Sequence, residues 1–336
     1  MFDTIAIHRG RNSKSTAICK AITNIDYNFD YRGFTNGSKL SPFWFYLKAW
    51  LTSKEIPEAK NYFIEGGLCF MVGYFLKKRY PDSKLFVMVP EPIFYMDKNR
   101  SWLGKFLFNS RMKMMKETVD HFFFISKMVK DDAISFLGNN IRYSYLRHFI
   151  INIERFKYIP NKAKNIIYVC ERPHDTGYIK GLDIAVKIFE KYNKKYNEAK
   201  LYIVGSGTEA LKYGNKNILC LGYCNMEEIY KKCSILISPS RYDAFPLVVA
   251  ESALCGLVPI VSKKTGIKEI LEPINKELII DINDTDKWIE IIEKYMFMRE
   301  DSRENLYTQM QKEFIKLNQK DIINNFIKEF NLLKKN

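Results

Sequence analysis

Two carboxylates, Asp243 and Glu251, stand eight positions apart and could together bind the hydroxyl groups of a sugar or a ribose. Hydroxyl recognition suits them because a carboxylate accepts hydrogen bonds from hydroxyls, whereas it repels a phosphate. The preceding SILISPS predicts a strand, and FPLVVAESALCG predicts a helix that stops at a glycine. Both carboxylates should therefore lie around a helix start, at the carboxyl end of a strand.

The start of this helix also offers donors for an anion. Pro246 suits the first helical turn. The amides of Leu247 and Val248 would then have no acceptor within the helix and would point outward. Such a helix end binds phosphate without a charged side chain. The alternative is a solvated helix start with no ligand.

The stretch PSRYDAFPLVVAESALCGLVPIV resembles the donor site of retaining glycosyltransferases of family 4, which have two Rossmann-like domains (the GT-B fold). The shared features are the Pro-Ser pair, Phe245, Glu251, the helix-ending glycine and the strand after it. The following KKTGIKEIL resembles the family's Gly-Gly-x-x-Glu-Ile turn. Asp243 stands where the family usually has Glu, and Pro246 where it commonly has Gly. The resemblance is specific over residues 165–271.

The resemblance implies a role for each residue that matches. Glu251 would bind the ribose of a nucleotide-sugar donor, and Phe245 would belong to the same site. Asp243 would contact hydroxyls of the transferred sugar. Leu247 and Val248 would bind the distal phosphate through their amides.

An upstream stretch, YVCERPHDTGYIKGLDIAVKIF, resembles the family's strand, Arg, loop and Lys-Gly. Arg172 and Lys180 would neutralise the diphosphate in place of a metal ion, Arg as a bidentate fork and Lys as a point charge. With Asp243 they form the expected catalytic set. The alternative is that Arg172 is an ordinary surface residue.

Three further residues join the expected donor site through the resemblance. Gly205 ends the strand-like LYIVG and would lie beside the ligand. Gly222 and Tyr223 fall in the stretch whose backbone contacts the nucleobase in the family. A tyrosine in the core is the alternative for Tyr223.

The first half of the chain matches the family only faintly. Gly10 follows the first predicted strand and precedes a helix-like stretch, so it could face the donor phosphates, with a plain turn as the alternative. Many relatives place a catalytic histidine where this chain has Glu91 between two prolines. Glu91 and His148, near the end of the last strand of this half, are the acceptor-side candidates.

The chain has 336 residues, which is enough for two domains of about 150 residues each. Short β-branched or aromatic runs alternate with amphipathic stretches, which favours an α/β fold with parallel sheets. We expect an acceptor-side Rossmann-like domain over 1–155 and a donor domain over 156–318, with a cleft between them. A helix over 319–336 should pack back on the first domain.

The formal net charge of +15 suggests an anionic partner. Residues 101–117 combine aromatic and basic side chains and could lie on an anionic membrane, helped by KLSPFWFYLKAWL. The alternative is a core-packed helix with a solvated basic face. No signal peptide or spanning segment is predicted, and seven scattered cysteines suit a reducing cytoplasm, with peripheral membrane contact as an extension.

The predicted function is therefore retaining transfer from a nucleotide-diphosphate sugar, UDP- or GDP-linked, to a hydroxyl of a glycan or lipid-linked acceptor. Surface polysaccharide or glycoconjugate synthesis is the expected setting, with no cofactor and no metal. The alternatives are a catalytically silent binding protein and a nucleotide-sugar epimerase. No nucleic-acid partner is expected, because no compact nucleic-acid-binding motif is present.

Overall fold

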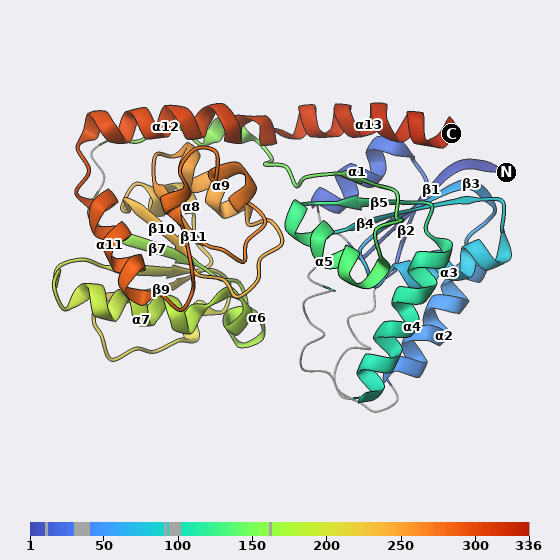
Figure 1. Ribbon diagram of the computed structural model, residues 1–336, viewed down its shortest axis with the longest axis horizontal. Coiled ribbons are helices and arrows are strands. Elements are labelled where there is room, and N and C mark those ends of the chain that lie inside the picture. The colour runs from blue at the N-terminus through green and yellow to red at the C-terminus, as the bar shows by residue number, and fades with distance from the viewer. Residues whose placement is uncertain (11–12, 30–40, 91–92, 94–101, 161–162, 336) are drawn as a thin grey trace. The chain divides into compact units, whose positions relative to one another are not determined.

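The computed structural model describes residues 1–10, 13–29, 41–90, 93, 102–160 and 163–335 (Figure 1). Its contacts divide the chain into two compact units, Met1–His148 with Lys320–Asn336, and Phe149–Gln319. The first division lies seven residues before the expected boundary at 155. The reason is that Ile150 already belongs to the second unit, where its amide donates to the carbonyl of Leu317 at 2.8 Å.

The first unit contains a six-stranded parallel sheet with the order β2-β1-β3-β4-β5-β6. The apolar strands are buried almost throughout, as expected when helices cover both faces of a parallel sheet. The strands are β1 (Phe2–His8), β2 (Asp26–Asn28), β3 (Ala59–Glu65), β4 (Lys84–Val89), β5 (His121–Phe124) and β6 (Tyr143–Tyr145). The helices are α1 (Ser13–Ile22), α2 (Ser41–Glu55), α3 (Phe70–Arg79), α4 (Trp102–Thr118), α5 (Lys127–Leu137) and α13 (Gln319–Lys335).

The last helix, α13, packs its aromatic face on this first sheet. Phe330 is fully buried, and its ring centre lies 4.9 Å from that of Phe86 on β4 and 5.8 Å from that of Phe63 on β3. Phe326 meets Phe123 on β5 at 5.3 Å. Burial of these rings stabilises the packing of α13 on the first sheet.

The second unit has its own six-stranded parallel sheet, with the order β12-β11-β10-β7-β8-β9. Its strands are β7 (Ile166–Val169), β8 (Leu201–Val204), β9 (Ile218–Gly222), β10 (Ile235–Ser238), β11 (Val258–Ser262) and β12 (Ile279–Ile280). Its helices are α6 (Pro173–Lys180), α7 (Leu182–Asn193), α8 (Met226–Tyr230), α9 (Leu247–Leu254), α10 (Lys268–Leu271), α11 (Thr285–Met296) and α12 (Glu300–Phe314).

In each sheet the strand order reverses at one place, from which the chain adds strands first on one side and then on the other, and we call this place the winding point. In the second sheet it lies between β7 and β10, and in the first sheet between β1 and β3. Ligands of doubly wound folds bind beyond the carboxyl ends of the strands at such a point. The predicted α/β class with two Rossmann-like domains is confirmed, and strand order directs attention to these two places.

Two local expectations need correction. Residues 173–180 form a helix, α6, where we expected a loop between Arg172 and Lys180, because Pro173 opens it at a position proline tolerates. Pro246 is the extended residue before α9, with φ −72° and ψ 103°, and so lies just outside the helix. The helix-ending glycine at 256 has the expected positive φ of 85°.

Candidate functional site

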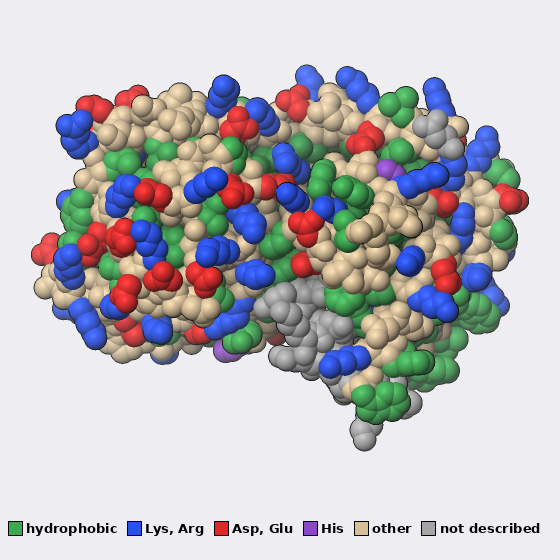
Figure 2. Space-filling model, viewed as in Figure 1, with side chains coloured by type: hydrophobic (Ala, Val, Ile, Leu, Met, Phe, Trp, Pro, Cys, Tyr) green, Lys and Arg blue, Asp and Glu red, His purple; other side chains and the backbone are tan. Residues whose placement is uncertain are grey.

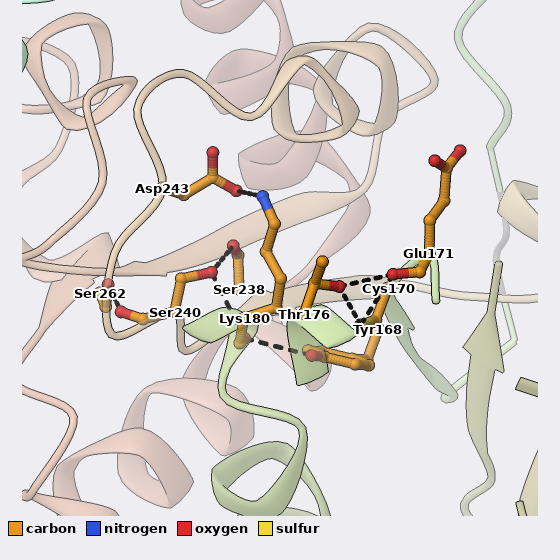
Figure 3. A network of polar contacts seen from close by, with 9 residues as sticks. All are labelled: Tyr168, Cys170, Glu171, Thr176, Lys180, Ser238, Ser240, Asp243 and Ser262. Atoms are coloured by element: carbon orange, nitrogen blue, oxygen red, sulfur yellow. Dashed lines mark hydrogen bonds and ion pairs between the residues drawn. The ribbon is translucent and has the colours of Figure 1, made fainter. Parts of the chain in front are cut away.

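The centre of the site is an ion pair between Lys180 and Asp243 (Figure 3). Lys180 ends α6, which follows β7, and Asp243 lies in the turn that follows β10. The lysine Nζ lies 2.5 Å from Asp243 Oδ2. The carboxylate is only 9% exposed, while the lysine side chain is about one-third exposed. The pair therefore joins the two strands that flank the winding point of the second sheet.

The backbone around Lys180 is held by the strand and turn beside it (Figure 3). The Tyr168 hydroxyl of β7 donates to the Lys180 carbonyl at 3.1 Å, and the Ser240 hydroxyl lies 3.4 Å from the same oxygen. Gly181 adopts φ +74°, and a Cβ there would lie 2.0 Å from the carbonyl oxygen of Pro239. Only glycine permits this close approach, so the Lys-Gly pair is a packing requirement as well as a source of charge.

The turn that carries Asp243 is fastened to the turn after β11. The Asp243 amide donates to the Lys264 carbonyl at 3.0 Å, and the Asp243 carbonyl accepts from the Gly266 amide at 2.8 Å. The Ser262 hydroxyl donates to the carbonyl of Ser240 at 2.6 Å (Figure 3). These bonds fix the backbone on both sides of the carboxylate.

Arg172 stands at the carboxyl end of β7 in a left-handed conformation, with φ 50° and ψ 65°. A non-glycine residue in this region carries roughly 1–3 kcal/mol of strain, and such strain collects at functional sites. The Arg172 amide donates to the Ser206 carbonyl at 2.7 Å, and its carbonyl accepts from the amides of Asp175 and Thr176. The side chain is exposed, and its guanidinium has no ion-pair partner within the described residues.

Arg241, in contrast, has a structural role next to the ion pair. Its two terminal nitrogens each lie 2.7 Å from a carboxylate oxygen of Asp183, and one also donates to the Tyr178 carbonyl. The guanidinium holds the pKa of the Asp183 carboxyl below its usual range. This fork fastens the turn after β10 to α6 and α7, which steadies Lys180 at the end of α6.

The start of α9 presents the amides expected there. Leu247 and Val248 are its first two residues, so neither amide has an acceptor one turn earlier in the helix. Glu251 is the fifth residue of α9 and is half-buried. Burial raises the pKa of the Tyr230 hydroxyl well above its usual value, and the Glu251 carboxylate adds to that shift. Phe245 is buried, which makes it a packing residue of this turn.

The ends of β8 and β9 place the remaining predicted residues of this unit. Gly205 follows β8 at φ +135°, and a Cβ there would lie 2.2 Å from the Cys170 carbonyl oxygen. The Gly222 amide donates to Thr208 Oγ1 at 3.0 Å. Tyr223 is 85% exposed, so the alternative of a core tyrosine is wrong.

The first unit holds the acceptor-side candidates, and only some can be described. Glu91 lies outside the described residues. His148 is half-buried and is the last residue of the unit's main segment. Gly10 is buried just after β1, with its carbonyl 3.0 Å from Nδ1 of His8. The other nitrogen of His8 lies 2.8 Å from Asp26, so both ring nitrogens are engaged.

Two buried polar residues escaped the sequence analysis. Glu65 ends β3, pairs in register with His8 and is 4% exposed, and its Oε2 has no hydrogen-bond partner among the described residues. Thr265 forms a backbone bridge with Asp243 and is fully buried, and its hydroxyl has no hydrogen-bond partner in the part of the chain that the structure describes. The signal for Glu65 was its position at the end of a predicted strand. For Thr265 the signal was a hydroxyl residue at the position of the first glycine in the family's Gly-Gly-x-x-Glu-Ile turn.

A cavity of about 900 Å³ lies elsewhere, at the amino ends of β1, β3 and β4 in the first unit. Two of the lysines that line it have structural partners. Lys84 donates to the Lys334 carbonyl at 3.0 Å, and Lys334 pairs with Asp3 at 2.9 Å. We therefore infer that this cavity belongs to the attachment of α13 to the first sheet, and that ligands bind at the carboxyl ends of the strands.

Comparison with known proteins gives a family match for the second half of the chain. Residues 151–313 match the model of the glycosyl transferases group 1 family. An uncharacterized glycosyltransferase of Methanocaldococcus jannaschii is 29% identical over 133 residues, covering 36% of this chain and 33% of that protein. The gpi3 subunit of phosphatidylinositol N-acetylglucosaminyltransferase from Schizosaccharomyces pombe is 24% identical over 183 residues, covering 50% of this chain and 39% of that protein. The chain thus spans little more than a third of these relatives.

Solved structures match the fold over the full chain. A UDP-forming trehalose-phosphate synthase from Burkholderia xenovorans has a TM-score of 0.77 at 11% identity, covering 100% of this chain and 99% of that one. Sucrose-phosphate synthase from Thermosynechococcus elongatus has a TM-score of 0.75 at 13% identity, covering 98% and 99%. At these identities the likeness shows the fold, which is the GT-B fold.

Proposed function

We propose that this chain, whose residues 151–313 match the model of the glycosyl transferases group 1 family, moves a sugar from a nucleotide-diphosphate sugar to an acceptor hydroxyl. The observation that carries the proposal is the Lys180–Asp243 pair at the winding point of the second sheet. A cation and a carboxylate held side by side can serve the two parts of such a donor. Lys180 meets the diphosphate, and Asp243 accepts hydrogen bonds from sugar hydroxyls.

Arg172 supplies the second cation. Its strained backbone projects an exposed guanidinium from the carboxyl end of β7, the edge from which Lys180 also comes. Two positive groups can balance the charge that grows on the diphosphate as the sugar leaves. This arrangement supports the proposal that the protein, rather than a metal ion, stabilises the leaving group.

The nucleotide is proposed to follow the same edge of the second unit. The amides at the start of α9 bind the distal phosphate, and Glu251, one turn along that helix, binds the ribose. Gly222 and Tyr223 at the end of β9 meet the base, and the exposed ring of Tyr223 is free of the core. A UDP- or GDP-linked sugar fits this assignment.

We propose transfer with retention at the anomeric carbon, by front-face displacement. The acceptor oxygen attacks from the face that the diphosphate leaves, and the acceptor proton passes to the departing phosphate oxygen. The C–O bond to the diphosphate breaks while the bond to the acceptor forms. The protein's part is to position both groups and stabilise the leaving charge.

A glycan or lipid-linked hydroxyl is the proposed acceptor, in surface polysaccharide or glycoconjugate synthesis. The S. pombe relative is named for transfer to a phosphatidylinositol lipid, which supports an acceptor of that class. On the acceptor side, Glu65 is the described carboxylate at the winding point of the first sheet. Its unpaired oxygen can accept a hydrogen bond from the attacking hydroxyl.

A donor screen tests the proposal. The protein is incubated with UDP-, GDP-, dTDP- and ADP-sugars, and released nucleotide is measured by mass spectrometry. We expect release from one donor, with loss in Lys180→Ala and Glu251→Ala and no loss in Lys187→Ala, a surface lysine of α7. Removing one charge-assisted hydrogen bond of about 1.5–3 kcal/mol should lower kcat/KM roughly 10- to 150-fold.

The same screen separates the two alternatives. An epimerase would convert the donor into an isomeric nucleotide sugar without releasing nucleotide. A silent binding protein would protect one donor in a thermal-shift assay without changing it. Near-normal turnover in both site variants would contradict the assignment of the residues.

A further inference from the structure

An apolar patch on the first unit stands in water although the strands beneath it are buried. We call it the aromatic face. Trp102 is 79% exposed, and the other members are between 39% and 63% exposed. Figure 2 shows hydrophobic side chains gathered over the end of this unit that carries α2 and α4 in Figure 1. The aromatic face consists of Phe43, Trp44, Trp50 and Leu51 on α2, and Trp102 and Phe106 on α4.

Helix α2 is apolar on both sides, and one of them faces outward. Its inward side carries Phe45 and Ala49, four residues apart and buried. Its outward side carries Phe43, Trp50 and Leu51, at the spacing of seven and eight residues that returns to one helix face. A helix on a protein surface normally presents polar residues to water. An outward side made of large apolar residues therefore suits a partner that replaces water.

Helices α2 and α4 approach each other on the first unit. The Arg111 guanidinium of α4 lies 6.0 Å from the ring centre of Phe45 on α2, and Figure 1 shows the helices side by side. The two helices carry six Lys or Arg and only two Glu. The Lys54 ammonium lies 3.6 Å from the ring centre of Trp50. Tryptophan rings with lysines around them are typical of surfaces at a bilayer interface.

We propose that the aromatic face binds the surface of an anionic lipid bilayer. Its rings enter the boundary between head groups and acyl chains, and the surrounding lysines contact lipid phosphates. Within the described residues no helix is long and apolar enough to cross a membrane, so the contact is made from one side. The sequence placed this contact mainly on residues 101–117, with help from KLSPFWFYLKAWL, and in the structure α2 supplies four of the six exposed apolar residues.

Charge favours lipid over a second copy of the chain as the occupant. Two copies joined through the same face would bring their basic residues together, which costs free energy through like-charge repulsion. An anionic lipid surface instead neutralises that charge. The proposal does not depend on the transfer reaction, because vesicle binding can be measured without a nucleotide sugar.

Intrinsic fluorescence gives a direct test. The chain has four tryptophans. Three are exposed on the aromatic face, and Trp288 is fully buried in the other unit. Vesicles of phosphatidylcholine with phosphatidylglycerol should shift the emission to shorter wavelength and carry the protein upward on flotation. Vesicles of phosphatidylcholine alone should bind it at least about tenfold more weakly.

Two pairs of variants separate the apolar and charged contributions. Trp44→Ser with Trp102→Ser should weaken vesicle binding at least about tenfold, because each ring removes a large buried area. The matched control is Leu332→Ser, an exposed apolar residue of α13. Lys105→Ala with Lys113→Ala should weaken binding about fivefold for each lysine removed.

Three results would overturn the proposal. The first is no flotation of the full chain with anionic vesicles at low salt. The second is equal vesicle binding by the full chain and the double tryptophan variant. The third is a wild-type dimer in light scattering that Trp44→Ser with Trp102→Ser converts to monomer, with no lipid binding by either. That third result would assign the aromatic face to self-association.

Discussion

Replacement of Gly181 by alanine should damage both stability and activity, through one close contact. The new Cβ would lie 2.0 Å from the Pro239 carbonyl oxygen and 2.8 Å from its carbon. At φ +74° alanine adds strain of roughly 1–3 kcal/mol, and overpacking against a backbone group adds roughly 1–3 kcal/mol more. We therefore expect the free energy of unfolding to fall by roughly 2–6 kcal/mol.

The activity loss follows from the geometry of the ion pair. To relieve the contact, the backbone at Gly181 must move by about 1 Å, and Lys180 is its neighbour. A displacement of about 1 Å in a positioning group lowers kcat/KM roughly 100-fold. The assays are urea unfolding followed by circular dichroism, and nucleotide release with the donor identified in the screen.

Gly214→Ala is the matched control. A Cβ at Gly214 meets nothing within 4 Å, so the same change should leave activity intact and stability equal or slightly higher. The reasoning is refuted if Gly181→Ala keeps wild-type stability and kcat/KM. It is also refuted if Gly214→Ala is equally harmful, since the close approach to Pro239 would then explain nothing.

Three further predictions concern the first unit. Phe330→Ala should lower the unfolding free energy of the first unit by roughly 3–5 kcal/mol, because the ring is fully buried against Phe86. Urea unfolding measures the change, and an unchanged midpoint would show that α13 does not stabilise the unit. Burial, with a smaller contribution from Arg142, lowers the pKa of His121 from 6.5 to about 4. As the pH falls, the unfolded chain therefore binds this proton before the folded protein does. The contribution of His121 to stability is complete above about pH 6.5, and the free energy of unfolding should fall by at most about 3 kcal/mol toward pH 4. His121→Phe should flatten that pH profile, and an unaltered slope would contradict the assignment. Glu65→Gln should raise the acceptor KM while keeping thermal stability, because the buried Oε2 that it replaces makes no hydrogen bond within the described residues. A stability loss with unchanged KM would indicate a structural role.

Much of the fold could be predicted from local pattern. The strands β7, β8, β9, β10 and β11 and the helices α7, α8 and α9 lie where the alternation of apolar runs placed them. Such segments carry their period in consecutive residues, so no distant contact is needed to recognise them. The short strands β2 and β12 were not predicted, because two or three residues carry no period and their pairing decides their conformation.

The motif around Asp243 and Glu251 pointed to ligand chemistry before any contact was known. The sequence could not decide that Lys180 is the partner of Asp243, 63 residues away. That pairing requires β7 and β10 to be neighbours, which depends on the strand order of the whole sheet. The same holds for Thr265, whose proximity to Asp243 depends on the pairing of β10 with β11.

Exposure was the other property that tertiary structure decided. By itself the sequence indicated that residues 101–117 form a basic helix with aromatic residues and that KLSPFWFYLKAWL is an apolar segment, which the structure shows to be part of the helix α2. A helix that is apolar all round does not reveal which side is covered, because burial depends on the neighbours packed against it. The structure buries Phe45 and leaves Trp44 and Trp50 in water. Residue types and spacing therefore indicated the chemistry of the site. Which residues pair and which side chains are exposed depend on the sheet order and packing that bring distant segments together.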